Sequence, residues 1–359
     1  MTTANILSQL GSAGVSTGFK NRIINGAMVI DQRNSGASFT QTTTTTYTLD
    51  RFASQGTVAS KYTVQQNAGS VTPPVGFTKY LGVTSSSAYS VGSSDAFTIQ
   101  QSIEGFNIAD LAWGTANAKT VTLSFQVYSS LTGTFGGSIR NGALNRSYPF
   151  TYSIPVANTW TSISVTVAGD TTGTWATDNS TGINLVFGLG VGSTYSGTAG
   201  TWAGTNYNSA TGAVSVVGTN GATFYITGVQ LEVGTTATNF EVRDYGRELA
   251  LCQRYYWQLD TNTHPSSLFN GDFSTGNAAI SIFTNPVYMR TGPTVVMPAN
   301  NTFTFNPASV TATTITGYSA GNQGGRLVWN TSGSPTAGNA YHIDTTGTAS
   351  TYLTFSAEL

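Results

Sequence analysis

The sequence is poor in charge, in cysteine and in long apolar runs. Only 8% of its 359 residues are charged and the formal net charge is −1, so no basic surface for nucleic acid or an anionic membrane is expected. A single cysteine, Cys252, excludes an internal disulfide framework. No apolar stretch reaches about 18 residues, so no membrane insertion is expected. Residues 1–19 contain no Lys or Arg and no sustained apolar core, which argues against a secretory signal.

Threonine, glycine and aromatic residues are abundant instead. The chain has 60 Thr, 41 Gly, 17 Tyr, 18 Phe and 6 Trp, while the helix-favouring residues Lys, Glu and Arg are scarce. Threonine and aromatic side chains suit the pleated, half-buried surfaces of β-sheets. A hydrophobic content of 39% is ample for a core, so the composition predicts an all-β protein rather than a disordered chain or an α/β enzyme.

Alternating apolar and polar residues predict strands throughout residues 21–240. In the first such segment, Leu123 and Phe125 share one face, whereas Gln126 and Tyr128 share the other. Gly228 is expected to introduce a β-bulge within the last of them. Many one-sided strands without intervening helices predict an antiparallel β-sandwich. The segments with this pattern are 120–128, 161–167, 183–189 and 222–233.

One helix is expected, from Asp244 as N-cap to about Gln258, within a linker formed by residues 241–258. Its apolar face is too wide for a free surface helix, which favours burial in an interdomain or subunit interface. Residues 259–359 return to β composition and predict a smaller β-sandwich with a thin core, which a homotrimer would support. The interface candidates are Leu249, Leu251, Cys252, Tyr255 and Tyr256.

Residues 1–20 are expected to form an arm rather than a folded element. Serine and glycine dominate this segment and apolar residues are few, so it cannot fold alone. We expect it to anchor the protein on a neighbouring protein.

Several short motifs resemble a domain found in many tailed-bacteriophage fibre proteins. The most specific is the series formed by residues 226–234, 239–241 and 248–256 (ITGVQLEVG, NFE and ELALCQRYY). Shorter landmarks agree with it: 21–28, 47–52, 101–105, 121–125, 158–160 and 173–175. The resemblance covers roughly residues 21–359, including the last residues Ser356–Leu359.

Such domains are similar to jelly-roll carbohydrate-binding modules. The resemblance implies a jelly-roll sandwich over residues 21–240 and a homotrimeric tail fibre or spike that is assembled in the host cytoplasm, is located in the virion and touches host-surface polysaccharide. Related modules often carry an acidic residue near a structural calcium in the opening strand. Ala27 occupies that position here, which weakens the case for calcium.

Glycan binding calls for aromatic rings that stack on sugar faces, together with amides and hydroxyls that form hydrogen bonds. The polar face of residues 120–128 offers Gln126 and Tyr128, and that of residues 222–233 offers Tyr225 and Gln230. Trp175 and Trp202 recur in the repeat Gly-Thr-Trp-Ala. The competing interpretation is that these tryptophans are packing residues of a small sandwich.

Catalytic and metal-binding motifs are weak. The Gly-x-Ser-x-Gly pentapeptides around Ser16 and Ser319 lack the helix that a nucleophile elbow requires. Asp170 and Asp178 flank Trp175 and could form a glycosidase pair, although a solvated turn is favoured. Asp170, Asp178 and Asn179 are the best calcium candidates. His264 and His342 have no useful ligand spacing. We expect a non-enzymatic protein without a cofactor.

Two functions therefore remain open. One is a receptor-binding fibre whose ligand is host glycan. The other is a purely structural virion protein, such as a head decoration, a collar or a fibre shaft, that binds only other virion subunits.

Overall fold

The computed structural model describes residues 20–259, 269–275, 278–297, 302–306, 310–333, 340–346 and 353–359, and it divides the chain into two compact units. Residues 1–19 of the expected anchoring arm (residues 1–20) and His264 lie outside the described residues. The first unit ends at Arg243, and the expected linker helix belongs to the second unit, which begins at Asp244 and also takes in two early segments. These early segments are Ile30–Ser35 and Leu49–Arg51.

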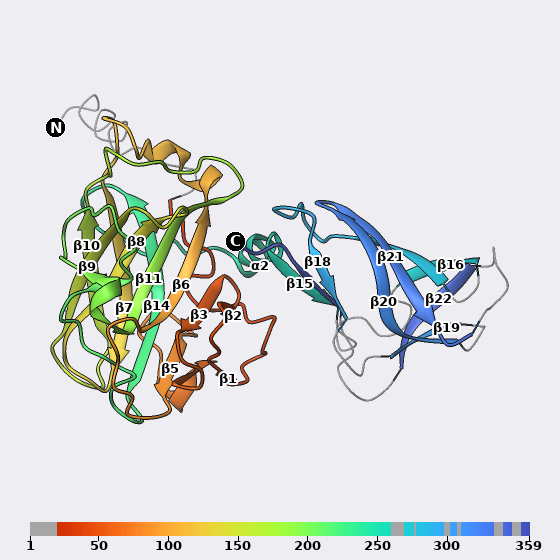
Figure 1. Ribbon diagram of the computed structural model, residues 1–359, viewed down its shortest axis with the longest axis horizontal. Coiled ribbons are helices and arrows are strands. Elements are labelled where there is room, and N and C mark those ends of the chain that lie inside the picture. The colour runs from red at the N-terminus through yellow and green to blue at the C-terminus, as the bar shows by residue number, and fades with distance from the viewer. Residues whose placement is uncertain are drawn as a thin grey trace, which may run out of the picture. The chain divides into compact units, whose positions relative to one another are not determined.

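The first unit is an antiparallel β-sandwich of two six-stranded sheets, as expected (Figure 1). In spatial order, sheet A contains β1 (Phe39–Thr40), β4 (Tyr62–Gln66), β5 (Leu81–Ser85), β14 (Thr223–Val233), β7 (Val121–Ser129) and β10 (Thr161–Val167). Sheet B contains β2 (Thr46–Leu49), β3 (Phe52–Gly56), β6 (Ala96–Glu104), β11 (Thr181–Val191), β8 (Gly133–Asn141) and β9 (Ser147–Ile154). The smaller elements are β12 (Ser196–Gly197), β13 (Ser209–Ala210) and four 3₁₀ turns, η1 (Ala68–Ser70), η2 (Gly105–Asn107), η3 (Ala109–Leu111) and η4 (Ser193–Tyr195).

The predicted strands of the sandwich are confirmed, although β11 and β14 are buried on both faces and not on one alone. Leu123, Phe125 and Val127 of β7 are buried between the sheets, while Ser124, Gln126 and Tyr128 of the same strand are only partly covered. The predicted bulge is also present. At Gly228 (φ 63°) the pairing of β14 with β7 shifts, so that Thr227 lies opposite Gln126 and Gln230 lies opposite Ser124.

The helix is shorter than its apolar pattern predicts. Helix α2 spans Tyr245–Gln253, and the Asp244 side chain accepts a hydrogen bond from the Arg247 N–H as the expected N-cap. The chain then enters strand β15 (Tyr256–Leu259), which pairs with β23 (Leu353–Ser356). Pairing with a strand about 100 residues away thus overrides the local helical pattern, and the aromatic residues suit the strand.

The second unit is all-β apart from α2 in its described part, and its main sheet is a closed barrel where two stacked sheets were expected. All neighbouring strands are antiparallel, and β22 pairs with both β16 and β19, which closes the sheet and removes its edges. The barrel order is β16 (Phe269–Thr275), β17 (Ala278–Thr284), β21 (Gly324–Thr331), β20 (Val310–Gly321), β19 (Thr302–Asn306) and β22 (Ala340–Thr346). A three-stranded sheet adds β18 (Thr294–Val296) to β15 and β23.

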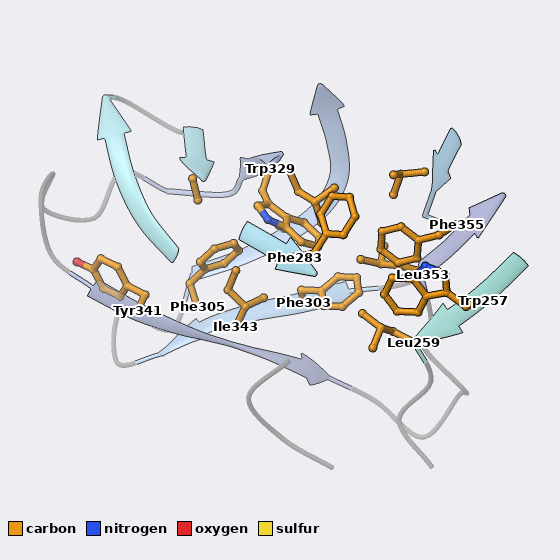
Figure 2. Packing of buried hydrophobic residues seen from close by; sticks show 14 of the residues in the cluster. Trp257, Leu259, Phe283, Phe303, Phe305, Trp329, Tyr341, Ile343, Leu353 and Phe355 are labelled. Carbon is orange, nitrogen blue, oxygen red and sulfur yellow. The ribbon is translucent and has the colours of Figure 1, made fainter. Parts of the chain in front are cut away.

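Aromatic residues fill the core of the second unit, as Figure 2 shows. Trp257 stacks on Phe355 with ring centroids 4.0 Å apart, and Phe283 of the barrel contacts Phe355 at 4.8 Å. Within the barrel, Trp329 is fully buried and donates a hydrogen bond to Ser281. The barrel and the small sheet therefore share one core, and it is less thin than the composition suggested.

Within the described residues, no helix has the length and apolar character needed to cross a membrane.

Candidate functional site

Gln126 and Tyr128 lie on the outer face of sheet A, where the alternation of β7 predicted them to be. Ser162 of β10 is the register partner of Gln126. The Gln126 amide donates to the Ser162 hydroxyl at 2.8 Å, and that hydroxyl donates back to the Gln126 carbonyl at 3.0 Å. This pair is solvent-accessible, so both groups can exchange hydrogen bonds with a ligand.

The Gln126–Ser162 pair lies in the floor of a groove of about 570 Å³. Ser124 and Ser164 extend this polar floor, and we call the whole depression the sheet A groove. Its walls are apolar and come from two loops, with Val75 and Phe77 in one and Phe240 and Val242 in the other. Phe77 and Phe240 meet edge to face with centroids 5.1 Å apart. The groove thus combines hydroxyl and amide groups with exposed apolar surface.

Gly228 allows one wall of the groove to approach the sheet. Its positive φ is costly for other residues, and a Cβ there would lie 2.6 Å from the Phe77 ring. The bulge that the sequence predicted therefore also positions Phe77.

An aromatic cluster lies beside the groove on the same sheet. Tyr128 stacks on Tyr225 with centroids 5.3 Å apart and an interplanar angle of 5°, and Tyr225 stacks on Tyr80. Trp160 contacts both Tyr80 and Tyr128 at 5.5 Å. Tyr225 and Tyr80 are buried, which raises the pKa of each phenol. Tyr128 and Trp160 are partly exposed and can offer ring surface to a ligand.

Gln230 is buried, like Tyr225, the other candidate on β14. Its side chain is fully buried and its amide donates to Glu232 at 2.9 Å. Its carbonyl accepts from the Glu241 N–H at 2.8 Å. Gln230 therefore holds the segment that carries Phe240 and does not face a ligand.

Trp175 and Trp202 belong to a packed cluster with Trp113. The three ring centroids lie 4.7 to 5.4 Å apart, each pair edge to face. Each indole N–H has an acceptor within the chain. Trp175 is buried and Trp202 is only partly exposed, so these rings pack against each other, in line with the competing interpretation.

Asp170 and Asp178 have partners that occupy their oxygens. Arg146 donates to both carboxylate oxygens of Asp170, at 2.8 and 2.7 Å. Burial acts to raise the pKa of Asp170, but the hydrogen bonds from Arg146 and Thr172 outweigh it and hold the pKa below its usual value. Asp178 accepts from the Ser180 backbone and hydroxyl in an exposed turn that also contains Asn179.

These contacts describe an ion pair and a turn rather than a catalytic pair. Within the part of the chain that the structure describes, no group of three His, Cys, Asp or Glu residues is placed to hold a metal ion. Ser319 lies inside strand β20, not at a strand-to-helix turn.

The interface candidates divide into two groups. Leu249 and Leu251 of α2 are half-buried. Cys252, Tyr255 and Tyr256 are buried within the second unit, where burial raises the pKa of the Cys252 thiol. The Arg51 guanidinium lies 3.6 Å above the Tyr255 ring, and that of Arg33 lies 3.5 Å above the Tyr256 ring.

Sequence reasoning missed Trp160, Ser162, Phe77 and Phe240. Ser162 had a usable signal because it shares the alternating pattern of residues 161–167. The two phenylalanines had none, since loops far apart in sequence bring them together.

No family model matches the chain, and no curated protein does. Among solved structures, the enzymatically active domain of tailspike protein 4 from bacteriophage CBA120 is 14% identical over 60% of this chain, with a TM-score of 0.31. The match covers 21% of that chain. A family 61 carbohydrate-binding module in complex with β-1,4-galactotriose is 9% identical, with 60% of this chain and 100% of that chain covered and a TM-score of 0.29. The family 11 module of Clostridium thermocellum, in complex with a mixed-linked tetrasaccharide, is 11% identical, with 57% and 100% covered and a TM-score of 0.28.

Proposed function

We propose that the first unit is a glycan-binding module and that the protein is a virion component that recognises polysaccharide on the host cell surface. The observation that carries this proposal is the sheet A groove, whose floor contains the exposed Gln126–Ser162 pair. Sugars combine many hydroxyls with apolar C–H faces, and the groove pairs a polar floor with Phe77 and Phe240. The resemblance of several motifs to those of tailed-phage fibre proteins supports the proposed role in a virion.

The proposed role is binding rather than catalysis. Asp170, the buried member of the one carboxylate pair that the sequence suggested, is held in an ion pair with Arg146 and has a lowered pKa. A general acid in glycoside hydrolysis needs the opposite shift.

The test is binding of the fluorescently labelled protein to an array of immobilised bacterial lipopolysaccharides and capsular polysaccharides. We expect saturable binding to a small subset, with inhibition by the same polysaccharide in solution. Gln126→Ala and Trp160→Ala should each weaken binding about tenfold, because each removes a hydrogen-bonding or stacking group worth about 1 to 1.5 kcal/mol.

Gln55→Ala is the matched control, since Gln55 is an exposed glutamine on β3 of the other sheet. Its binding should equal that of the wild type. A well-folded protein that binds no polysaccharide, or Gln126 and Trp160 variants that bind like the wild type, would contradict the proposal and favour the purely structural virion role.

We further propose that the chain assembles as a homotrimer through the half-buried leucines of α2. Leu251→Asp should convert the assembly to monomers or aggregates in sedimentation velocity, whereas Arg247→Gln on the exposed side of α2 should not. Tyr255 is not suitable for this test because its ring is buried within its own chain. A monomeric wild-type protein would contradict the trimer and leave the glycan proposal intact.

A further inference from the structure

The lining of the sheet A groove is neutral. Within the described part of the chain, every residue that lines the groove has an uncharged side chain. A charged ligand would lose its water in the groove without gaining an opposite charge in exchange, which disfavours its binding. The groove is therefore suited to an uncharged ligand.

The charges beside the groove have partners of their own. Glu241 lies between two lining residues, but its carboxylate accepts hydrogen bonds from the Asn21 N–H, at 2.6 Å, and from Arg243, at 3.2 Å. Lys20 contacts the backbone of the loop that contains these lining residues, and its ammonium lies 4.0 Å from the carboxylate of Glu232. These pairs hold the loop to the sandwich and do not supply a charge to the groove.

The walls of the groove expose aliphatic side chains to water. Val75 is fully exposed and Val242 is 81% exposed, and both line the groove. Each lies two residues from a phenylalanine of the same wall, and the rings of these phenylalanines, Phe77 and Phe240, contact each other. The valines therefore extend an apolar surface around the phenylalanine pair, and they are not single apolar residues scattered over the exterior.

The polar groups of the floor are within reach of a ligand. Ser162 and Ser164 are exposed, and Ser124 and Gln126 are partly exposed. Hydroxyl and amide groups both donate and accept hydrogen bonds, so they can pair with sugar hydroxyls of either orientation. A ligand of the groove should therefore present hydroxyls to the floor and an apolar group to the walls.

A 6-deoxyhexose combines these features in one uncharged ring. Its ring hydroxyls remain, but the carbon at position 6 is a methyl group, where a hexose has a hydroxymethyl group and a hexuronic acid has a carboxylate. Covering the methyl group with valine side chains removes apolar surface from water. Covering the hydroxymethyl group in the same way would leave its hydroxyl without a partner.

We propose that the sheet A groove binds an uncharged 6-deoxyhexose of the host polysaccharide, with the ring hydroxyls on the serine and glutamine floor and the methyl group against Val75 and Val242. The inference rests on the proposed glycan-binding function and names the class of sugar that the groove takes.

The experiment compares sugars that differ only at position 6. The full chain is titrated with D-fucose, D-galactose and sodium D-galacturonate, and then with 6-deoxy-D-glucose, D-glucose and sodium D-glucuronate. L-rhamnose and L-mannose form a further pair. Ligand signals are followed by saturation-transfer NMR with irradiation of the aromatic protons of the protein.

We expect at least one series to bind. In it, the deoxy sugar should bind about fivefold more tightly than the hexose and at least about tenfold more tightly than the uronate. The methyl group should receive the largest saturation transfer, because Phe77 and Phe240 lie in the same walls as the valines.

Exposed valines provide the matched variants. Val75→Thr and Val242→Thr keep the shape of the side chain and replace one methyl with a hydroxyl, so each should reduce the preference for the deoxy sugar about threefold. Val156→Thr is the control, since Val156 is an exposed valine between β9 and β10 outside the lining of the groove. Gln126→Ala should weaken the deoxy sugar and the hexose equally, because both present ring hydroxyls to the floor.

A hexose or uronate that binds as tightly as its deoxy counterpart would overturn the inference, as would a preference that survives both valine variants. Absence of saturation transfer to every sugar, in a protein that binds polysaccharide on the array, would also overturn it and would leave the proposed function intact. Absence of both kinds of binding would contradict the proposed function and this inference with it.

Discussion

Arg140 and Arg146 lie at the two ends of the turn between β8 and β9, yet they have different electrostatic environments. Arg146 shares two hydrogen bonds with Asp170, and the two side chains are 19% and 2% exposed. Arg140 is 5% exposed and contacts only amide oxygens. The hydrogen bonds to Asp170 raise the pKa of Arg146, whereas burial lowers that of Arg140.

The two arginines therefore differ in whether a carboxylate compensates the buried charge. Arg146 and Asp170 form a closed pair beside the tryptophan cluster, and the pair has no remaining need for a ligand. Arg140 is buried among neutral acceptors, so part of the desolvation penalty of its charge remains.

The largest expected effect comes from breaking the closed pair. Asp170→Ala leaves the Arg146 charge uncompensated and removes an acceptor of the Trp175 indole N–H. We expect a loss of about 3 to 4 kcal/mol in the free energy of unfolding. Chemical denaturation followed by tryptophan fluorescence measures it, with Asp178→Ala in the exposed turn as the control. A loss below about 1 kcal/mol would show that the pair is not structural.

Asp50 shows whether a nearby arginine can offset the effect of burial on the pKa of a carboxyl group. Burial raises its pKa to about 6, despite the charge of Arg33 and hydrogen bonds from Gln32. Because the folded pKa exceeds the unfolded value of about 3.9, the folded state binds more protons and stability falls as pH rises from 4 to 6.

The fall for Asp50 should total about 3 kcal/mol, since each pKa unit corresponds to about 1.4 kcal/mol. Asp50→Asn should flatten this part of the pH dependence of unfolding, while Asp244→Asn, which keeps the N-cap, should not. An unchanged slope in Asp50→Asn would show that the Asp50 carboxyl does not titrate in this window.

Supplying the missing carboxylate should make Arg140 resemble Arg146. Asn208→Asp places a carboxylate on a group that Arg140 already contacts. We expect a gain of about 1 kcal/mol in the free energy of unfolding. Asn206→Asp offers a second version of the same test. If the free energy of unfolding does not change, the charge of Arg140 is already compensated.

The smallest effect is expected from removing the uncompensated charge itself. Arg140→Met retains the apolar stem and should change the ligand-free stability by less than about 1 kcal/mol, because the lost hydrogen bonds are offset by the desolvation penalty that disappears. Arg146→Met should cost about 3 kcal/mol because it strands Asp170. Stability is measured by thermal and chemical unfolding. An equal loss of stability in the two variants would show that the two arginines do not differ in charge compensation.

The strand pattern and the outer-face position of Gln126 and Tyr128 could be predicted because period-two alternation fixes which side chains share a face. The Gly228 bulge was likewise readable from the sequence. The length of the helix and the closure of the barrel could not be predicted from the sequence. Both depend on pairing between strands far apart in the chain, β15 with β23 and β22 with β16. Gln230 and Trp175 were misplaced as ligand-facing because distant segments cover them.

The sequence alone determined the all-β composition, the faces of the strands and the N-cap at Asp244, since each depends on neighbours within a few residues. It could not distinguish Arg140 from Arg146, since both are arginines of one hairpin. Only the tertiary structure decided that Asp170 reaches one of them and that Asn206 and Asn208 reach the other. The energy of a buried charge is set by the groups that surround it in space, and those come from segments about 24 to 68 residues away.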